Sequence, residues 1–413
     1  MPNASIAINA GPLPLGGGLL ALLRPALDAL EVGGVLALLS SNAAARDDLP
    51  TWCKVEKHEY LGCEKVADAD RHLIARGGFN LPRGEREHGL RLPLRDGKLM
   101  AADVLATIPH AATADPATGL APRGARVEPG GPEYPFTLNE RDRVAPPDVA
   151  QLYDQAVAAQ WNAQTDIAWA KIKPLPRALE TAVGQLMTFL AENELSALYL
   201  PSKFIARIHP AYVEVGMFLS TQLMDESRHI DVFLKRARAN GGGLGVSSAT
   251  TSASLHSLLM LEDFTEAAFL LSVLGEGTFL DLLRFIEDHA PDEPTADLVR
   301  RARADETRHV HFGMSHVRHA LATDPSLYGR LENAVRKRAA TLHNAGGVPA
   351  AVQDSLTVLA ARGTGPAGIA RGHDKFAELL HVMHENRVKR LITAGFTPEQ
   401  SQTLSDLHTP NFM

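Results

Sequence analysis

The sequence predicts a multidomain α+β chain that is mainly α: a small α/β sandwich followed by a helical bundle with extra helices. Three observations support this. Short apolar segments alternate with helical ones at the start, glycine and proline recur in the middle, and helical periodicity covers almost everything after that. The 413 residues are enough for two or three domains. We expect an α/β domain, a connector, a helical domain and a C-terminal helical extension at residues 1–78, 79–146, 147–345 and 346–413.

Composition narrows the class of protein. Hydrophobic residues make up 45% and charged residues 22%, as in an ordinary globular protein. The net charge of −7 argues against a general nucleic-acid binder, which carries a basic excess. No apolar run reaches the roughly 20 residues that a membrane helix needs. No lysine or arginine precedes Arg24, so the charged region of a secretory signal is missing. We therefore expect a cytoplasmic protein with neither a membrane nor a nucleic acid as partner.

Cysteine is scarce, with only Cys53 and Cys63 in the chain. Two cysteines cannot form a disulfide scaffold, nor can they supply the four ligands of an iron–sulfur cluster. If this protein performs redox chemistry, we expect its electrons to come from another protein.

The first domain is predicted to alternate strands and helices. Apolar segments at residues 4–10, 34–39 and 72–75 are typical of strands, and leucines recur at helical spacing over residues 19–30. A second helix is predicted at residues 43–53. This alternation favours a small α/β sandwich.

This first domain resembles the TusA/SirA-like sulfur-carrier family. The resemblance lies in LDALEVGGVLALLSSNAAARDDLPTWC at residues 27–53, followed by EKHEY and RHLIARGG in the place of the closing strands. That family carries Cys-Pro-x-Pro at the start of its first helix, and here the cysteine position falls on Gly16. Because sulfur transfer needs a thiolate, the resemblance implies the fold without the transfer. The expected role is docking onto, or covering, the helical domain or its redox partner.

Helices are predicted over most of the chain beyond the glycine- and proline-rich connector. Their expected ranges are 147–168, 176–206, 211–239, 255–288, 295–322, 326–343, 349–361 and 367–393. Pro201 lies inside the second of these, where we expect a kink or an end. Residues 240–254 are mostly Gly, Ser, Thr and Ala, and we expect an irregular crossover there that spans the length of a helix.

One five-residue motif occurs twice in the helical region. D-E-S-R-H at residues 225–229 is matched by D-E-T-R-H at residues 305–309. Helical residues three apart share a face, so each copy can present one carboxylate and one imidazole to the same ion. The candidate ligands from the two copies are Glu226, His229, Glu306 and His309.

Each copy is preceded by a glutamate on an earlier helix, at nearly the same distance upstream. Glu194 and Glu276 both have apolar neighbours at helical spacing. A carboxylate in an apolar stripe is costly unless it is neutralised, and a metal ion would neutralise it. Glu192 is the rival to Glu194, but its helical neighbours are more polar.

Two lone glutamates and two Glu-x-x-His pairs resemble the ligand set of ferritin-like four-helix bundles with di-iron or di-manganese centres. The resemblance covers residues 176–320 and implies two iron ions, or manganese or a mixed pair, that activate O₂. It further implies oxidation of a small organic substrate by hydroxylation, N-oxygenation or desaturation, as in a monooxygenase, with electrons from a separate reductase. A homodimer is one expected assembly.

The remaining motif residues resemble those of bacterial multicomponent monooxygenases and the ribonucleotide reductase radical subunit. By that resemblance Asp305 orients His229 and Asp225 orients His309, and the arginines of the two motifs, Arg228 and Arg308, pair with these aspartates.

Two departures leave the substrate open. Leu280 stands where multicomponent monooxygenases carry a threonine, and Ala302 stands where arylamine N-oxygenases carry a seventh ligand. Two further functions remain open: a non-catalytic protein for metal storage or sensing, and a scaffold whose first domain binds a partner. The length and the appended domain argue against storage, which uses a compact bundle.

Overall fold

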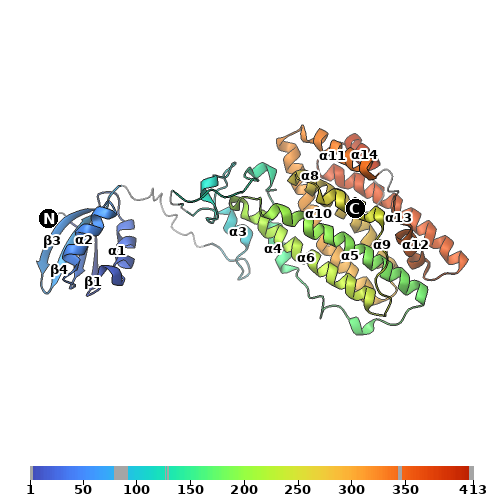
Figure 1. Cartoon of the computed structure of the whole chain (residues 1–413), viewed down its shortest axis with the longest axis horizontal. Helices are drawn as coiled ribbons and strands as arrows, with labels where there is room; N and C mark the ends of the chain where they lie inside the picture. Colours follow the sequence, from blue (N-terminus) through green and yellow to red (C-terminus); the bar gives the residue numbers. More distant parts are fainter. Residues whose placement is uncertain (1–2, 79–91, 126, 128–129, 343–346, 409–413) are drawn as a thin grey trace. The chain divides into compact units, whose positions relative to one another are not determined.

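The computed structural model describes residues 3–78, 92–125, 127, 130–342 and 347–408 (Figure 1). It divides the chain into two compact units, Met1–Arg91 and Leu92–Met413. A small sheet unit ahead of a mainly helical unit is the coarse fold class that the sequence predicts, and it is confirmed. Every hydrophobic cluster of the described residues lies wholly within one of the two units.

The smaller unit is a four-stranded mixed sheet with helices packed on one face (Figure 1). The strand order is β1-β2-β4-β3, with β1 parallel to β2 and β4 antiparallel to both of its neighbours. Its elements are β1 (Ile6–Gly11), the short helix η1 (Leu15–Gly17), α1 (Leu19–Asp28), β2 (Val35–Ser40), α2 (Ala45–Val55), β3 (Glu59–Val66) and β4 (Ala69–Ala75).

Leucines at helical spacing explain how α1 packs on this sheet. Leu19, Leu23 and Leu27 are fully buried and contact the alternate sheet residues Leu36 and Leu38. Residues that repeat about every 3.6 positions on the helix therefore pack against residues that repeat every second position on the strand. This is the pattern of a sheet that is covered by helices on one face. The likeness to sulfur carriers stays a prediction.

The described part of the expected connector, residues 92–125, 127 and 130–146, belongs to the larger unit. It contains α3 (Ala101–Ala106), η2 (Pro116–Thr118) and η3 (Arg141–Arg143). It packs across the helices, since the Tyr212 hydroxyl donates to the carbonyl of Asn139 at 2.9 Å and Arg123 pairs with Glu214 at 2.8 Å. The earlier connector residues, 79–91, lie outside the described part.

Helices dominate the larger unit. They are α4 (Val149–Ala158), η4 (Trp169–Lys171), α5 (Arg177–Ile205), η5 (Pro210–Tyr212), α6 (Val213–Arg238), α7 (Ala249–Leu259), α8 (Phe264–Ala268), η6 (Phe269–Glu276), α9 (Gly277–His289), α10 (Glu293–Thr323), α11 (Leu327–Leu342), α12 (Ala350–Ala361), α13 (Pro366–Thr393) and α14 (Pro398–Leu407). None of the described helices combines the length and the apolar character that crossing a bilayer requires.

The expected helix over residues 255–288 is wrong as a single element. The backbone breaks after α7, and Asp263 caps α8 by accepting a hydrogen bond from the Glu266 N–H at 2.9 Å. Helix α7 also begins inside the expected crossover, because Ser248 caps it by accepting from the Thr251 N–H at 3.0 Å. Polar caps at both places satisfy free N–H groups and so start new helices.

Three further elements bear on the sequence expectations. Of the kink or end expected at Pro201, the end is wrong, because α5 runs through that residue to Ile205. Helix α14 was not expected, although Thr397 and Gln400 form a reciprocal capping box at its start. Segment η6 is a π-helix, which hydrophobic periodicity does not reveal.

Candidate metal centre

A buried polar layer crosses the middle of the larger unit between two apolar clusters. Along α5, the residues before Glu194 belong to one cluster and those after it to the other. The same change of cluster occurs on α6 around Glu226, on α10 around Glu306, and where η6 passes into α9 at Glu276. Four helices thus bring their carboxylates to one level, where apolar side chains above and below exclude water.

The six candidate ligands gather in this layer as two groups. One contains Glu194, Glu226, His229 and Glu306, the other Glu226, Glu276, Glu306 and His309, and the possible ligand atoms within each group all lie within 4.8 Å of one another. Glu226 and Glu306 belong to both groups. All six side chains are at most 1% exposed.

The two shared glutamates lie between the histidines. Glu226 directs Oε2 toward His229 Nδ1 at 3.3 Å and Oε1 toward His309 Nδ1 at 3.1 Å. Glu306 does the same, with Oε1 at 3.2 Å from His229 Nδ1 and Oε2 at 3.2 Å from His309 Nδ1. Two carboxylates that each face both imidazoles have the geometry of bridging ligands between two ions.

Unsatisfied polar atoms mark the same place. Both carboxylate oxygens of Glu226, one oxygen each of Glu194, Glu276 and Glu306, and His229 Nδ1 are buried without a hydrogen-bond partner among the described residues. Buried polar atoms are normally paired, because each unpaired one costs about 1–3 kcal/mol and charged groups cost more. A pair of cations would satisfy them, so the donor set fits two metal ions.

Electrostatics in this layer sets Glu194 and Glu276 apart from Glu226. Burial, and then the charges of Glu306 and Glu226, raises the pKa of Glu194 well above its usual value. Burial and the charge of Glu306 also raise the pKa of Glu276. For Glu226 burial acts in the same direction, but His309 and His229 outweigh it and lower its pKa. Without cations Glu194 and Glu276 therefore hold protons more readily than exposed carboxyl groups do, and bound cations would displace those protons.

The other ring nitrogen of each histidine faces an aspartate from the opposite motif. His229 Nε2 donates to Asp305 Oδ2 at 3.1 Å, and His309 Nε2 donates to Asp225 Oδ2 at 3.3 Å. This pairing fixes the tautomer and leaves Nδ1 of each ring directed at the glutamates. Burial opposes ionisation of Asp305, but hydrogen bonds led by the one from His229 lower its pKa.

Both motif arginines bind these aspartates. Arg228 donates to Asp305 Oδ2 at 2.9 Å and also to Asp225 on its own helix. Arg308 donates to Asp225 Oδ2 at 3.1 Å and also to Asp305. Each guanidinium therefore joins α6 to α10, and each carboxylate receives charge from both helices.

Two residues of this network were missed by the sequence analysis. Trp161 donates its indole N–H to Asp305 Oδ2 at 2.8 Å, and its ring lies 4.7 Å from the Arg228 guanidinium. Gln160 donates to Asp225 Oδ1 at 3.1 Å and accepts from Arg228 at 2.7 Å. Both lie within the expected helix over residues 147–168, but that helix ends earlier, with α4 at Ala158, and the two side chains reach the network from the segment that follows it.

The π-helix η6 ends at Glu276, on the side of the layer next to a small cavity. The Gln222 amide donates to Glu276 Oε1 at 3.1 Å. The cavity has a volume of about 20 Å³, and its lining includes Gln222, Ser272, Leu271 and Phe312. About one probe sphere, roughly 10–15 Å³, is enough for a water molecule, so this space accepts one molecule of about that size.

Comparison with known proteins finds limited similarity. No family model matches the chain, and no curated protein matches it. Among solved structures, an R2-like ligand-binding oxidase with an aerobically reconstituted metal cofactor after photoconversion is 19% identical, with a TM-score of 0.46. A mutant of that oxidase with an anaerobically reconstituted Mn/Fe cofactor is also 19% identical, with a TM-score of 0.47. Each match covers 60% of this chain and 93% of that chain.

Proposed function

We propose that the chain binds two metal ions, two irons or a pair containing manganese, and uses them to oxidise a small organic substrate with O₂. The observation that carries this proposal is the placement of Glu226 and Glu306, each with one oxygen toward each histidine. In this arrangement Glu194 and His229 would complete the ligands of one ion, and Glu276 and His309 would complete those of the other. A di-iron or manganese–iron pair supplies the chemistry of O₂ activation when bound.

The protein's own residues prepare the site for this chemistry. Asp305 and Asp225 hold the histidine rings, and the two arginines hold the aspartates, so the ligands are preorganised. Apolar clusters on both sides keep bulk water away from the six ligands. An oxidising centre benefits because a dry site limits side reactions.

The small cavity beside Gln222 supports O₂ as one reactant. Its lining is largely apolar, and it accepts a molecule the size of water or O₂ but not an organic substrate without side-chain movement. We place the organic substrate at this same side, where the π-helix η6 ends at Glu276, because π-helical segments frequently occur at functional sites. Hydroxylation, N-oxygenation and desaturation stay open. A separate reductase is proposed as electron donor, and cytoplasmic location stays a prediction.

Metal analysis tests the proposal directly. The purified chain should hold about two iron or manganese ions, and Glu226→Ala or Glu306→Ala should lower that content sharply and abolish reductant-dependent O₂ uptake. Glu192→Ala is the matched control, because Glu192 lies two residues from Glu194 on α5 but accepts a hydrogen bond from Ser247 at 2.6 Å, away from the centre. Full metal content in both ligand variants would refute the proposal. Uptake of iron far beyond two equivalents into a large shell would indicate storage instead.

A further inference from the structure

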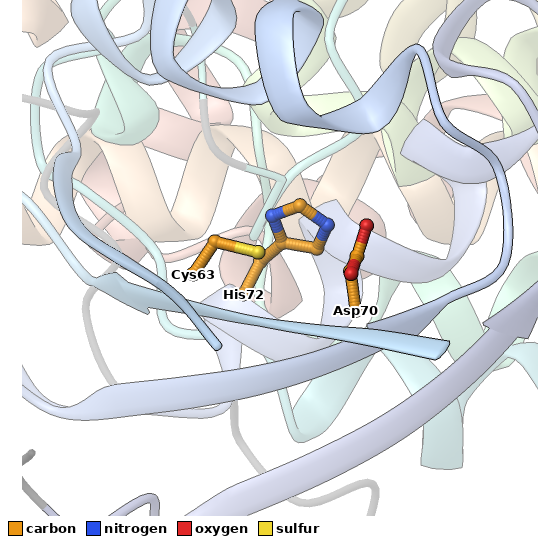
Figure 2. Close-up of side chains that lie close together, drawn as sticks. All are labelled: Cys63, Asp70 and His72. Atoms are coloured by element: carbon orange, nitrogen blue, oxygen red, sulfur yellow. The ribbon is translucent and has the colours of Figure 1, made fainter. Parts of the chain in front are cut away.

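The smaller unit carries a second group of possible metal ligands, which is independent of the function proposed for the helical unit. Cys63 on β3 and Asp70 and His72 on β4 place a sulfur, an oxygen and a nitrogen atom within 4.8 Å of one another. Figure 2 shows the three side chains turned toward one another on the same side of the strands. Asp70 and His72 are buried, and Cys63 is half-buried.

A β-bulge creates this grouping. The register of β3 on β4 shifts between Tyr60 and Gly62, and Gly62 has the positive φ of 129° that favours glycine. Because of the extra residue, Cys63 pairs with His72. Tyr60 and Cys63 would point to opposite faces of a regular strand, but here both face His72. Bulges commonly re-aim a side chain in this way beside a functional site.

His72 is fully buried and has one unused ring nitrogen. Its Nδ1 lies 2.8 Å from the Tyr60 hydroxyl, whereas its Nε2 has no hydrogen-bond partner among the described residues. A buried ring nitrogen without a partner costs free energy. With Nδ1–H donating to Tyr60, the lone pair of Nε2 is available to an ion, and such a hydrogen bond on the second nitrogen is typical of histidine ligands.

Asp70 keeps room for an ion although Arg46 and Lys65 already contact it. The Arg46 guanidinium donates to both oxygens at 2.7 Å, and the Lys65 ammonium lies 3.5 Å from Oδ1. An ionised carboxylate has about four lone-pair positions, so at least one remains for a metal. Arg46 is more than half exposed, which lets it adjust as an ion enters.

We propose that Cys63, Asp70 and His72 form a binding site for a late first-row divalent ion such as Zn²⁺. Thiolate, imidazole and carboxylate are the ligands that zinc takes, and three protein ligands leave the fourth tetrahedral position to water. On binding, the S–H bond of Cys63 breaks, a sulfur–metal bond forms, and the proton passes to solvent with no change of oxidation state. Zinc sites have ligand bonds of about 2.0–2.3 Å, so the three donor atoms move closer together on binding.

The same three residue types could instead form a nucleophilic thiol with a base. The buried Nε2 of His72, without a hydrogen-bond partner among the described residues, together with the convergence of a sulfur, an oxygen and a nitrogen donor, favours a bound ion. Thiol catalysis is an outcome of the test.

Cobalt titration of the full chain separates this site from the one in the helical unit. The six ligands proposed there include no cysteine, so a thiolate-to-Co²⁺ charge-transfer absorption reports only on a cysteine ligand. We expect the band to saturate at one equivalent per chain and to vanish in Cys63→Ser. It should persist in Cys53→Ala, because the Cys53 side chain lies in the hydrophobic core beneath α2. Zinc should then displace the cobalt. The band should also persist in Glu226→Ala, so the two proposals fail separately.

A second measurement needs no variant. Zinc at a few equivalents should protect Cys63 of the wild-type chain from iodoacetamide by at least about tenfold in rate, and His72→Asn should abolish the protection. Absence of the band, its survival in Cys63→Ser, or alkylation of Cys63 at an unchanged rate with zinc would each overturn the proposal. Turnover of a thioester or persulfide probe at Cys63 without metal would assign the thiol to catalysis instead.

Discussion

At the scale of single residues, the repeated motif divides its work between two helices. The glutamate and histidine of each copy face the shared layer, whereas the aspartate reaches the histidine of the other copy. Each arginine then binds aspartates from both copies. The network is therefore complete only when α6 and α10 lie side by side. The aspartate of each helix then orients the histidine of the other helix.

The first prediction concerns Asp305, which receives hydrogen bonds from His229, Arg228 and Trp161. Asp305→Asn removes the charge that orients the His229 ring and should lower metal affinity or O₂ uptake by roughly 10–100-fold with the helical fold retained. Asp231→Asn is the control, because Asp231 is half-buried on α6 and pairs only with Lys235 among the described residues. Equal metal affinity in the two variants would contradict the role assigned to Asp305.

The second prediction concerns pH and His316. Burial, and then the charge of His319, lowers the pKa of His316 to about 4, against about 6.5 in the unfolded chain. Between these two pKa values the unfolded state binds a proton at His316 and the folded state does not. The contribution of neutral His316 to stability is therefore complete above pH 6.5 and is lost as pH falls toward 4. Between pH 7 and pH 5 the loss should be about 2 kcal/mol.

Urea unfolding at the two pH values measures this loss. His316→Gln should lose about 2 kcal/mol less than wild type over the same interval when both proteins are in the same metal state. An equal pH dependence of the two free energies of unfolding would show that the buried histidine does not contribute.

At the scale of elements, close packing of α10 on the π-helix brings two ligand-bearing segments together. Gly313 lies one turn beyond His309, and a Cβ atom there would come within 2.6 Å of Ser272 Cβ on η6. The glycine thus permits an approach that any side chain would prevent. Glu276 at the end of η6 and Glu306 on α10 depend on that approach to share one group of ligands.

The third prediction follows from this contact. Gly313→Ala should push α10 away from η6, lower the free energy of unfolding by about 1–3 kcal/mol and weaken metal binding. Gly329→Ala is the matched control, since that position on α11 is exposed and has nothing within 4 Å of the added Cβ. The control should be neutral or more stable by up to about 1 kcal/mol. Wild-type stability and metal content in Gly313→Ala would disprove the packing argument.

At the scale of the whole molecule, each unit has hydrophobic clusters of its own. A ligand that binds one unit should therefore stabilise that unit alone. The fourth prediction is that Mn²⁺, which prefers oxygen and nitrogen ligands over thiolate, raises the unfolding temperature of the helical unit only. Calorimetry should show two transitions of which one responds to Mn²⁺, and a parallel shift of both would contradict the prediction.

Several features were predictable from the sequence because they are local. The motif spacing of three residues places a glutamate and a histidine on one face of a helix, and apolar neighbours at helical spacing distinguish Glu194 from the partly exposed Glu192. The alternation in the first domain likewise predicts its sheet and helices. These patterns depend on neighbours within one or two turns, which the sequence displays directly.

Tertiary structure alone decided the rest. Trp161 and Gln160 reach the aspartates from the segment after α4, where a continuing helix was expected, and Gly62 brings Cys63 opposite His72 through one extra residue in a strand. The close approach of α10 to the π-helix η6 requires Gly313, because a Cβ atom there would clash with Ser272. The physical reason is common to all of them. A periodic sequence specifies which face of an element is buried, whereas the partner that the face meets depends on packing between segments far apart in the chain.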